Sequence, residues 1–138
     1  MAADKKGLAV IFHSGSYDRL YHGLSLSLAA LALGREARFF FTYWALDCLR
    51  KSRPFPYELD PEARAHQEIL DRNMARGHLH KLPELFAQAK RLGARSYACT
   101  QSMGLLNISR DELADEIDKS MGLTTFLAET SQDQLIFI

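Results

Sequence analysis

The stretch that decides the fold is Gly7-Leu-Ala-Val-Ile-Phe-His-Ser-Gly-Ser16, near the start of the 138-residue chain. Its apolar run, Leu8 to Phe12, is rich in β-branched and aromatic residues and ends at a polar turn. A run without polar alternation is typical of a strand buried on both faces of a sheet. Leucines then recur at helical spacing over residues 17–33, with Ser16 placed to cap the first turn, so a helix follows the strand directly.

The same alternation of strand and helix continues to the end of the chain. Apolar runs predict further strands at 37–41, 95–99 and 135–138, and helical spacing and start signals predict helices at 44–51, 62–74, 84–92, near 110 and near 123–127. Pro54 and Pro56 break the chain after the second helix, and Ser109 to Glu112 form a capping-box pattern. This order indicates a three-layer, doubly wound α/β fold with a mainly parallel sheet of about five strands and helices on both faces.

Composition limits the classes of function. A hydrophobic content of 47% in a chain of this length supplies one core, so a single domain over residues 1–138 is expected. Lys and Arg together number 17, as do Asp and Glu, and a net charge of zero gives no general attraction to nucleic acid or to an anionic membrane. The most continuous apolar segment, 24–33, is far shorter than the roughly 20 residues of a membrane span.

The chain has two cysteines, Cys48 and Cys99, and no Cys-x-x-Cys pair. The opening residues lack the apolar region of a signal peptide, so we expect a cytoplasmic location with both thiols reduced. Without a zinc or dithiol motif, no metal or other cofactor is expected.

Reactive groups of open parallel sheets collect at the carboxyl ends of the strands. His13 follows the first predicted strand and Cys99 ends the third, which places both at that edge.

Cys99 lies where backbone donors are able to surround a thiol. N–H groups of the following turn and nearby hydroxyls would favour its thiolate, and the residues that supply them are Thr100, Gln101, Ser102 and Met103. The alternative is packing, because a free cysteine is among the most often buried residue types.

Four further residues are candidates for this site, each with two interpretations. His13 either hydrogen-bonds Cys99, if their strands are adjacent, or caps its own turn. Tyr43 and Trp44 line the cysteine pocket or form a subunit contact. Cys48 lies among apolar helical positions and is interpreted as core packing, the alternative being a resolving thiol for Cys99.

Two other patterns have structural interpretations. His78 and His80 share one side of an extended segment, as metal ligands can, but Arg76 and Lys81 oppose a cation, so a solvated loop is favoured. Small residues in the first helix allow close approach, either to the sheet or to a neighbouring subunit; they are Gly23, Ser25, Ser27, Ala29 and Ala30.

The run Cys99-Thr-Gln-Ser-Met103, followed by a Gly-apolar stretch and by Ser109-Arg-Asp-Glu-Leu113, resembles the cysteine loop of the DsrE/DsrF-like sulfur-relay family, in particular its TusD-like branch. The resemblance covers nearly the whole chain. Supporting segments are Arg76-Gly77 before Lys81-Leu82-Pro83, Ala94 ahead of the cysteine strand, and Thr125-Phe126-Leu127 leading to Ile136-Phe137-Ile138. The sequence departs at Gly104, where the most similar branch often has an acidic residue.

This resemblance implies a flavodoxin-like subunit that assembles into a homotrimer or a larger ring such as a homohexamer. It also implies that Cys99 accepts sulfane sulfur as a persulfide and passes it to a partner thiol, as a sulfur carrier or sulfurtransferase-like protein does. Its partners would be donor and acceptor proteins with reactive cysteines. The alternative is a non-catalytic oligomeric module that binds a small ligand or a partner at the same edge, with Cys99 incidental.

Overall fold

A computed structural model describes residues 6–52 and 58–138. Pro54 and Pro56 lie outside these ranges. Five strands found in the described ranges form one sheet with the order β4-β3-β2-β1-β5, and every pair of neighbours is parallel. The strands are β1 (Leu8–Phe12), β2 (Ala37–Phe41), β3 (Arg95–Cys99), β4 (Lys119–Met121) and β5 (Gln134–Phe137). The predicted three-layer parallel α/β class is confirmed.

The predicted helices occur in the predicted order, but a further helix follows Cys99, the helix predicted near 110 is a 3₁₀ turn, and two others differ in their bounds. They are α1 (Tyr17–Ala32), α2 (Tyr43–Asp47), α3 (Gln67–Ala75), α4 (Leu82–Arg91), α5 (Thr100–Leu106) and α6 (Leu123–Glu129), with 3₁₀ turns η1 (Pro61–His66) and η2 (Arg110–Glu112). The helix predicted at 44–51 ends early, because Arg50 bridges to Leu113 and the Lys51 N–H donates to the Glu112 carbonyl. The helix predicted at 62–74 is divided into η1 and α3.

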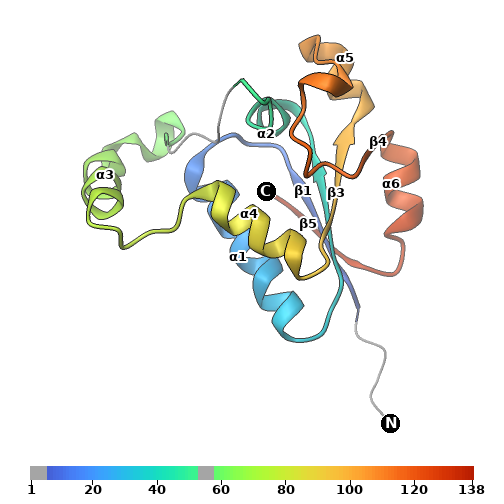
Figure 1. Ribbon diagram of the computed structural model, residues 1–138, viewed down its shortest axis with the longest axis horizontal. Coiled ribbons are helices and arrows are strands. Elements are labelled where there is room, and N and C mark those ends of the chain that lie inside the picture. Colours follow the sequence, from blue (N-terminus) through green and yellow to red (C-terminus); the bar gives the residue numbers. More distant parts are fainter. Residues whose placement is uncertain (1–5, 53–57) are drawn as a thin grey trace.

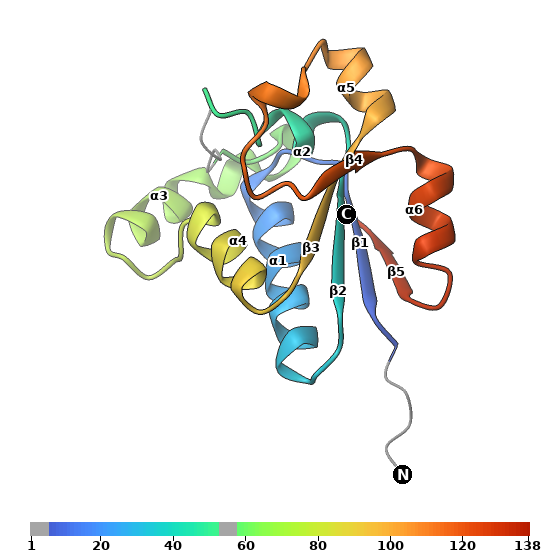
Figure 2. The same cartoon turned by 45° about the vertical axis from the view of Figure 1, so that its right-hand side comes forward.

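The helices are unequally distributed over the two faces of the sheet. Helices α1 and α4 lie against one face and α6 lies against the other (Figures 1 and 2). Crossovers between parallel strands are right-handed in nearly all proteins. The chain passes from β1 to β2 to β3 in one direction, which puts α1 and α4 together, and it returns from β4 to β5 in the opposite direction, which puts α6 on the other side.

Each face has its own hydrophobic cluster. The larger cluster fills the space under α1 and α4, where the Phe12 and Phe41 rings stack with centroids 4.9 Å apart. The smaller cluster lies on the α6 face, and its buried members are Ala9, Phe40, Tyr97, Cys99, Met121 and Phe126. Alternation along each strand separates the two sets, so that Ala98 faces the larger cluster while Tyr97 and Cys99 face the smaller one.

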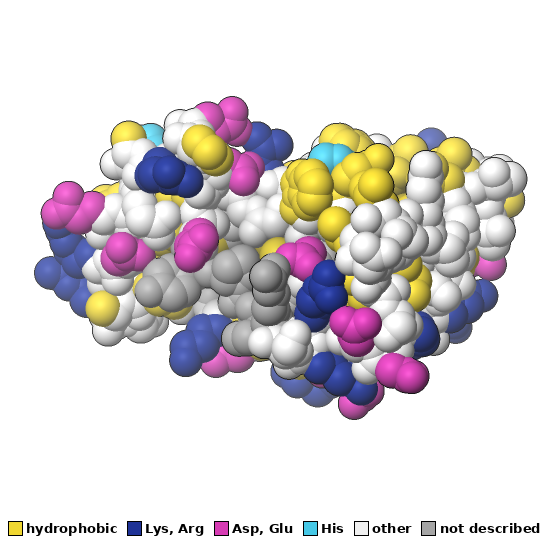
Figure 3. Space-filling model, turned by 90° about the horizontal axis from the view of Figure 1, so that it is seen from above, with side chains coloured by type: hydrophobic (Ala, Val, Ile, Leu, Met, Phe, Trp, Pro, Cys, Tyr) yellow, Lys and Arg dark blue, Asp and Glu magenta, His cyan; other side chains and the backbone are white. Residues whose placement is uncertain are grey.

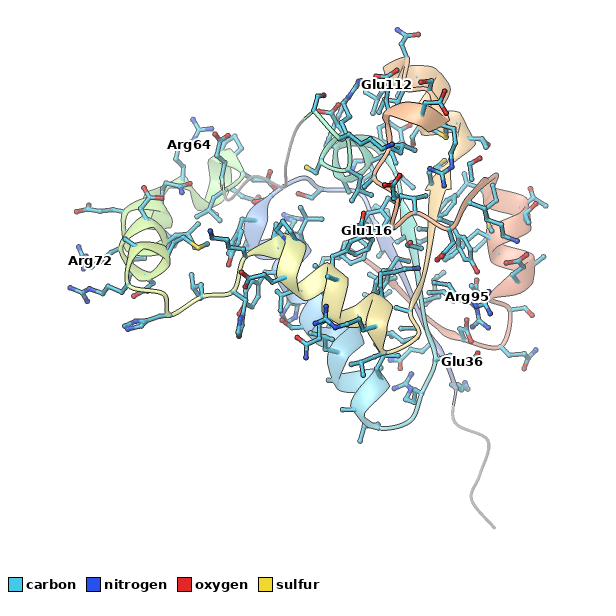
Figure 4. All side chains as sticks on the ribbon, viewed as in Figure 1. Glu36, Arg64, Arg72, Arg95, Glu112 and Glu116 are labelled. Carbon is cyan, nitrogen blue, oxygen red and sulfur yellow. The ribbon has the colours of Figure 1, made fainter. Side chains whose placement is uncertain are left out.

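Two regions lie away from this core. The first is η1 with α3, neither of which has a buried residue. Figure 4 shows Arg64 of η1 and Arg72 of α3 lying away from the sheet. His78 and His80 lie exposed in the loop that leads from α3 to α4. None of the helices in the described ranges combines the length and the apolar character needed to cross a membrane.

The small residues of α1 serve the approach of this helix to the sheet. A Cβ placed on Gly23 would lie 2.3 Å from Cε1 of Phe12, a fully buried ring of β1. Ser27 is also fully buried and donates its hydroxyl proton to the Gly23 carbonyl at 2.8 Å. Of the two interpretations, the structure therefore gives these two positions to packing against the sheet.

We predict that Gly23→Ala lowers the free energy of unfolding by about 1–3 kcal/mol, because the added methyl group forces Phe12 to move within a packed core. Gly104→Ala is the matched control: it also lies in a helix, but nothing stands within 4 Å of its added Cβ. There the better helix propensity of alanine should leave stability unchanged or raise it by up to about 1 kcal/mol. Urea titration of both variants measures the difference, and equal effects would contradict the Phe12 explanation.

Candidate functional site

The carboxyl ends of the strands bring together a group of rings from three separate segments. The His13 ring stacks on Tyr43 with centroids 4.6 Å apart and lies 5.6 Å from Phe137 of β5. Tyr43 in turn contacts Trp44, which is 54% exposed. Figure 3 looks down on this side of the molecule and shows hydrophobic side chains gathered around a histidine. We call these four residues, His13, Tyr43, Trp44 and Phe137, the edge ring cluster.

Cys99 lies at the same edge of the sheet, but its side chain is on the face opposite the larger hydrophobic cluster. It is both the last residue of β3 and the residue that precedes the first turn of α5. Its register partner in β4 is Met121, and its side chain belongs to the α6-side cluster with an exposed fraction of 2%. The predicted position at a strand end before a helical turn is therefore present, and the thiol is closed off from solvent.

His13 and Cys99 are not on adjacent strands. The sheet order places β2 between β1 and β3, so the adjacency on which a direct His13–Cys99 hydrogen bond depended is absent from the described sheet. The His13 N–H donates to the Ile138 carbonyl at 2.8 Å, which continues the pairing of β1 with β5. His13 accordingly belongs to the edge ring cluster.

The residues after Cys99 have distinct environments. Thr100 and Gln101 are exposed, while Met103 packs against the larger cluster. Ser102 is 1% exposed, and its hydroxyl oxygen accepts a hydrogen bond from the Tyr43 N–H at 3.0 Å. The Ser102 hydroxyl, which the sequence assigned to the thiol, thus holds the edge ring cluster to α5.

Tyr43 needs this support because its backbone is strained. Its φ angle of 46° lies in the left-handed region, which costs a non-glycine residue of the order of 1–3 kcal/mol. The sequence does not indicate this strain. The helix predicted at 44–51 implies a turn after β2, but the left-handed backbone of Tyr43 is recognisable from the fold alone.

Cys48 lies on the opposite side of the sheet from Cys99. It is partly buried against the larger cluster, and its sulfur lies 3.3 Å from the Trp44 carbonyl oxygen and 3.8 Å from that of Gly15. Cys99 belongs instead to the smaller cluster, so the geometry agrees with packing for Cys48 and gives no support to a resolving role.

A hollow of about 480 Å³ opens beside the edge ring cluster, and sequence reasoning did not find it. Arg19 forms ion pairs there with Asp60, at 3.3 Å, and with Glu62. The Ser14 hydroxyl donates to Asp60 at 3.0 Å. The hollow is lined by His13, Ser14, Arg19, Trp44, Asp60, Pro61 and Glu62. These residues come from three distant segments, and no motif connects them in the sequence.

Metal ligands are not grouped in the described part of the chain. Within residues 6–52 and 58–138, no group of three or more His, Cys, Asp or Glu side chains is arranged to hold an ion.

His80 has a structural contact through its backbone: its carbonyl oxygen accepts a hydrogen bond from the Tyr17 hydroxyl at 2.8 Å.

The geometry defines a parallel α/β protein with a buried cysteine at the junction of a strand and a helix. Residues 4–66 and 60–137 match the model of the DsrE/DsrF/DrsH-like family, and the chain belongs to that family. It is 25% identical over 154 aligned positions to the uncharacterized protein YrkE of Bacillus subtilis (strain 168), with 96% of each chain covered.

Solved structures share the fold. The ychN protein from E. coli has a TM-score of 0.64 at 12% identity. A protein of unknown function from Methanobacterium thermoautotrophicum, MTH1491, has a TM-score of 0.63 at 13% identity. In both cases the match covers 97% of this chain and 100% of the other chain. At these identities the likeness concerns the fold.

We predict that Ser102→Ala lowers the free energy of unfolding by about 1–2 kcal/mol, because a part-buried Tyr43 N–H loses its acceptor. Thr100→Ala removes a hydroxyl from an exposed position two residues earlier and should change stability by less than about 0.5 kcal/mol. Chemical denaturation of the two variants compares them. If they are equally stable, the Ser102 hydroxyl does not support Tyr43.

Proposed function

We propose that this protein is a sulfur carrier of the sulfurtransferase type, with Cys99 as the residue that holds the sulfur. The observation that carries the proposal is the place of Cys99, between the carboxyl end of β3 and the first turn of α5, in a chain of the DsrE/DsrF/DrsH-like family. The N–H groups of that first turn have no partner within the helix and point toward its start. Such groups are able to donate hydrogen bonds to an anionic sulfur, although in the closed structure the Cys99 side chain accepts none of them.

The transfer itself exchanges one sulfur–sulfur bond for another. The Cys99 thiolate attacks the outer sulfur of a donor persulfide, the donor leaves as a thiolate, and Cys99 becomes the persulfide. An acceptor thiolate then attacks the outer sulfur on Cys99, which returns to the thiolate. Neither step needs a metal or an external oxidant, because the sulfane sulfur keeps its oxidation state throughout.

The partners of this reaction would be proteins with reactive cysteines, acting as donor and acceptor in a reducing, cytoplasmic environment. The edge ring cluster supports a role in contacts between proteins, because Trp44 and Phe137 are 54% and 68% exposed. Exposed aromatic groups of this kind are enriched at protein interfaces. We include in the proposal a single domain over residues 1–138 that assembles into a homotrimer or homohexamer.

One observation favours the second candidate function, an oligomeric binding module in which Cys99 is incidental. The open hollow beside His13 and Trp44 lies at the same edge and has a mixed lining of rings and charges, whereas Cys99 is closed. Under this alternative a small ligand or partner occupies the hollow and the thiol only packs.

Incubation with a small-molecule persulfide donor separates the two functions. For a sulfur carrier, peptide mass spectrometry should find an adduct of about 32 Da, one sulfur atom, on Cys99 and not on Cys48. Cys99→Ala should abolish the adduct, and Cys48→Ala should leave it unchanged. Equal labelling of both thiols, or an unmodified Cys99, would favour the binding module.

We predict that light scattering at micromolar concentration and physiological salt gives a mass three or six times that of the 15.6 kDa chain. The exposed rings at the edge and the absence of net charge favour self-association, since copies of a neutral chain do not repel. Trp44→Ala, which removes an exposed ring, is expected to reduce the assembled fraction. A monomer mass for the wild-type protein would rule out the assembly.

A further inference from the structure

If Cys99 carries sulfur, its closed environment has to open during each transfer. Its side chain is 2% exposed, and a second sulfur atom has to reach it for the exchange to occur. The inference below rests on the proposed function for its purpose, but the motion that it describes is measurable without any sulfur transfer.

Helix α5 and the turn η2 form a layer above the carboxyl edge of the sheet, and several hydrogen bonds hold this layer to the rest of the protein. Arg50 donates to the Leu106 carbonyl at 3.2 Å and to Glu112 at 3.0 Å. The Ser109 N–H, followed by the Ser109 hydroxyl and the Arg50 charge, lowers the pKa of Glu112, so the carboxylate stays ionised within this network. Figure 4 shows Glu112 in this layer. With Ser102 also bonded to Tyr43, this layer has several links that an outward movement would break.

The start of β4 is also attached. Asp118 accepts a hydrogen bond from the Ser96 N–H at 2.7 Å and contacts the Lys90 ammonium. Burial opposes ionisation of Asp118, but the hydrogen bond and charge of Lys90 and the hydrogen bond from Ser96 outweigh it and lower the pKa. The connection into β4 is therefore a fixed point.

Between that point and Asp133, whose carboxylate pairs with Arg38 at 2.7 Å, few buried contacts hold the chain, and an ion pair between the exposed Lys119 and Glu129 at 3.7 Å adds little. Among the seven residues of α6, all of which the structure describes, Phe126 alone is buried, and its ring stacks on Phe40 at 4.5 Å. Leu123 and Leu127 are 44% and 48% exposed. The strand before it, β4, has three residues at one end of the described sheet, and its last register pair is Cys99 with Met121.

We propose that residues 121–129, which run from the end of β4 through α6, are a gate over Cys99. The segment moves away from the sheet between its fixed ends at Asp118 and Asp133, Phe126 leaves its place on Phe40, and the thiol becomes accessible. Segments with few buried apolar contacts open at lower free energy than the rest of a domain, so this opening does not require global unfolding. Closure would shield a persulfide on Cys99 from solvent thiols.

Alkylation by iodoacetamide under native conditions tests the gate, with Cys99 and Cys48 quantified separately by peptide mass spectrometry. Phe126→Ala weakens the gate, and Phe86→Ala removes another buried ring, 3% exposed against 0% for Phe126, from the opposite face. At urea concentrations that give the two variants the same free energy of unfolding, Cys99 should react at least tenfold faster in Phe126→Ala. Cys48 should react at the same rate in both, and equal Cys99 rates in the two variants would overturn the gate.

Hydrogen exchange on the wild-type protein gives a test that does not depend on the folding of a variant. The Phe126 and Thr130 amides, which donate within α6 and at its end, should exchange at least tenfold faster than the paired amides of β1 and β2. Their exchange should respond weakly to low urea, as local opening does. Protection equal to that of β1, lost together with it in urea, would overturn the gate.

Loading with a small persulfide donor then separates the gate from the proposed function. Faster sulfur loading of Cys99 in Phe126→Ala than in Phe86→Ala supports both. If alkylation shows the gate but no sulfur adduct forms in any variant, the gate stands and the carrier function fails. If sulfur loads Cys99 at the same rate in both variants, the carrier function stands and the gate is overturned.

Discussion

The right-handed turn of parallel crossovers is the constraint on which the rest of this structure depends. Because the chain moves from β1 through β3 in one direction across the sheet, that constraint collects α1 and α4 on one face. The return from β4 to β5 leaves the other face to α6, a helix of seven residues. We call the face under α1 and α4 the thick face and the face under α6 the thin face. The thick face holds most of the core and supplies stability, while the thin face holds Cys99.

The direction of the Cys99 side chain follows from the alternation of β3. Ser96 and Ala98 are fully buried toward α1 and α4, and Tyr97 and Cys99 are therefore directed toward α6. Cys99 is also the residue at which the strand becomes a helix, so one position combines a place on the thin face with the start of α5. The proposed chemistry uses the helix start, and the proposed gate uses the thin face.

The sequence predicted those elements that have a strong local signal. Apolar runs, interrupted at Arg38 in β2 and preceded by Arg95 and Ser96 in β3, predicted β1, β2, β3 and β5 to within a residue, since a strand buried on both faces is mostly apolar. Strand β4 has no such run, because it is an edge strand of the sheet, where Lys119 and Ser120 need little burial. Helix α5 was seen as a turn only, since its first residues include polar groups and Gly104.

The arrangement of the site depended on contacts that no local pattern encodes. The sequence placed both His13 and Cys99 at the carboxyl edge, but strand order separates them by β2. It predicted that the Ser102 hydroxyl hydrogen-bonds the thiol, whereas this hydroxyl accepts a hydrogen bond from the N–H of the strained Tyr43. The residues at the carboxyl edge were therefore predictable from their place in the sequence, whereas which of them contact one another depends on the strand order and on tertiary contacts.

The pairing of β5 with β1 has a consequence for the way this chain folds. Leu8 and Gln134 are register partners although nearly the whole sequence lies between them. Contacts of this range close large loops and slow the search for the native state. A nascent chain on the ribosome can pair β1 with β2 early, but the other side of β1 stays an open strand edge until β5 has emerged. Strand β1, an interior strand of the finished sheet, is thus the one whose edge stays unpaired longest during synthesis, when unpaired edges are most prone to aggregate.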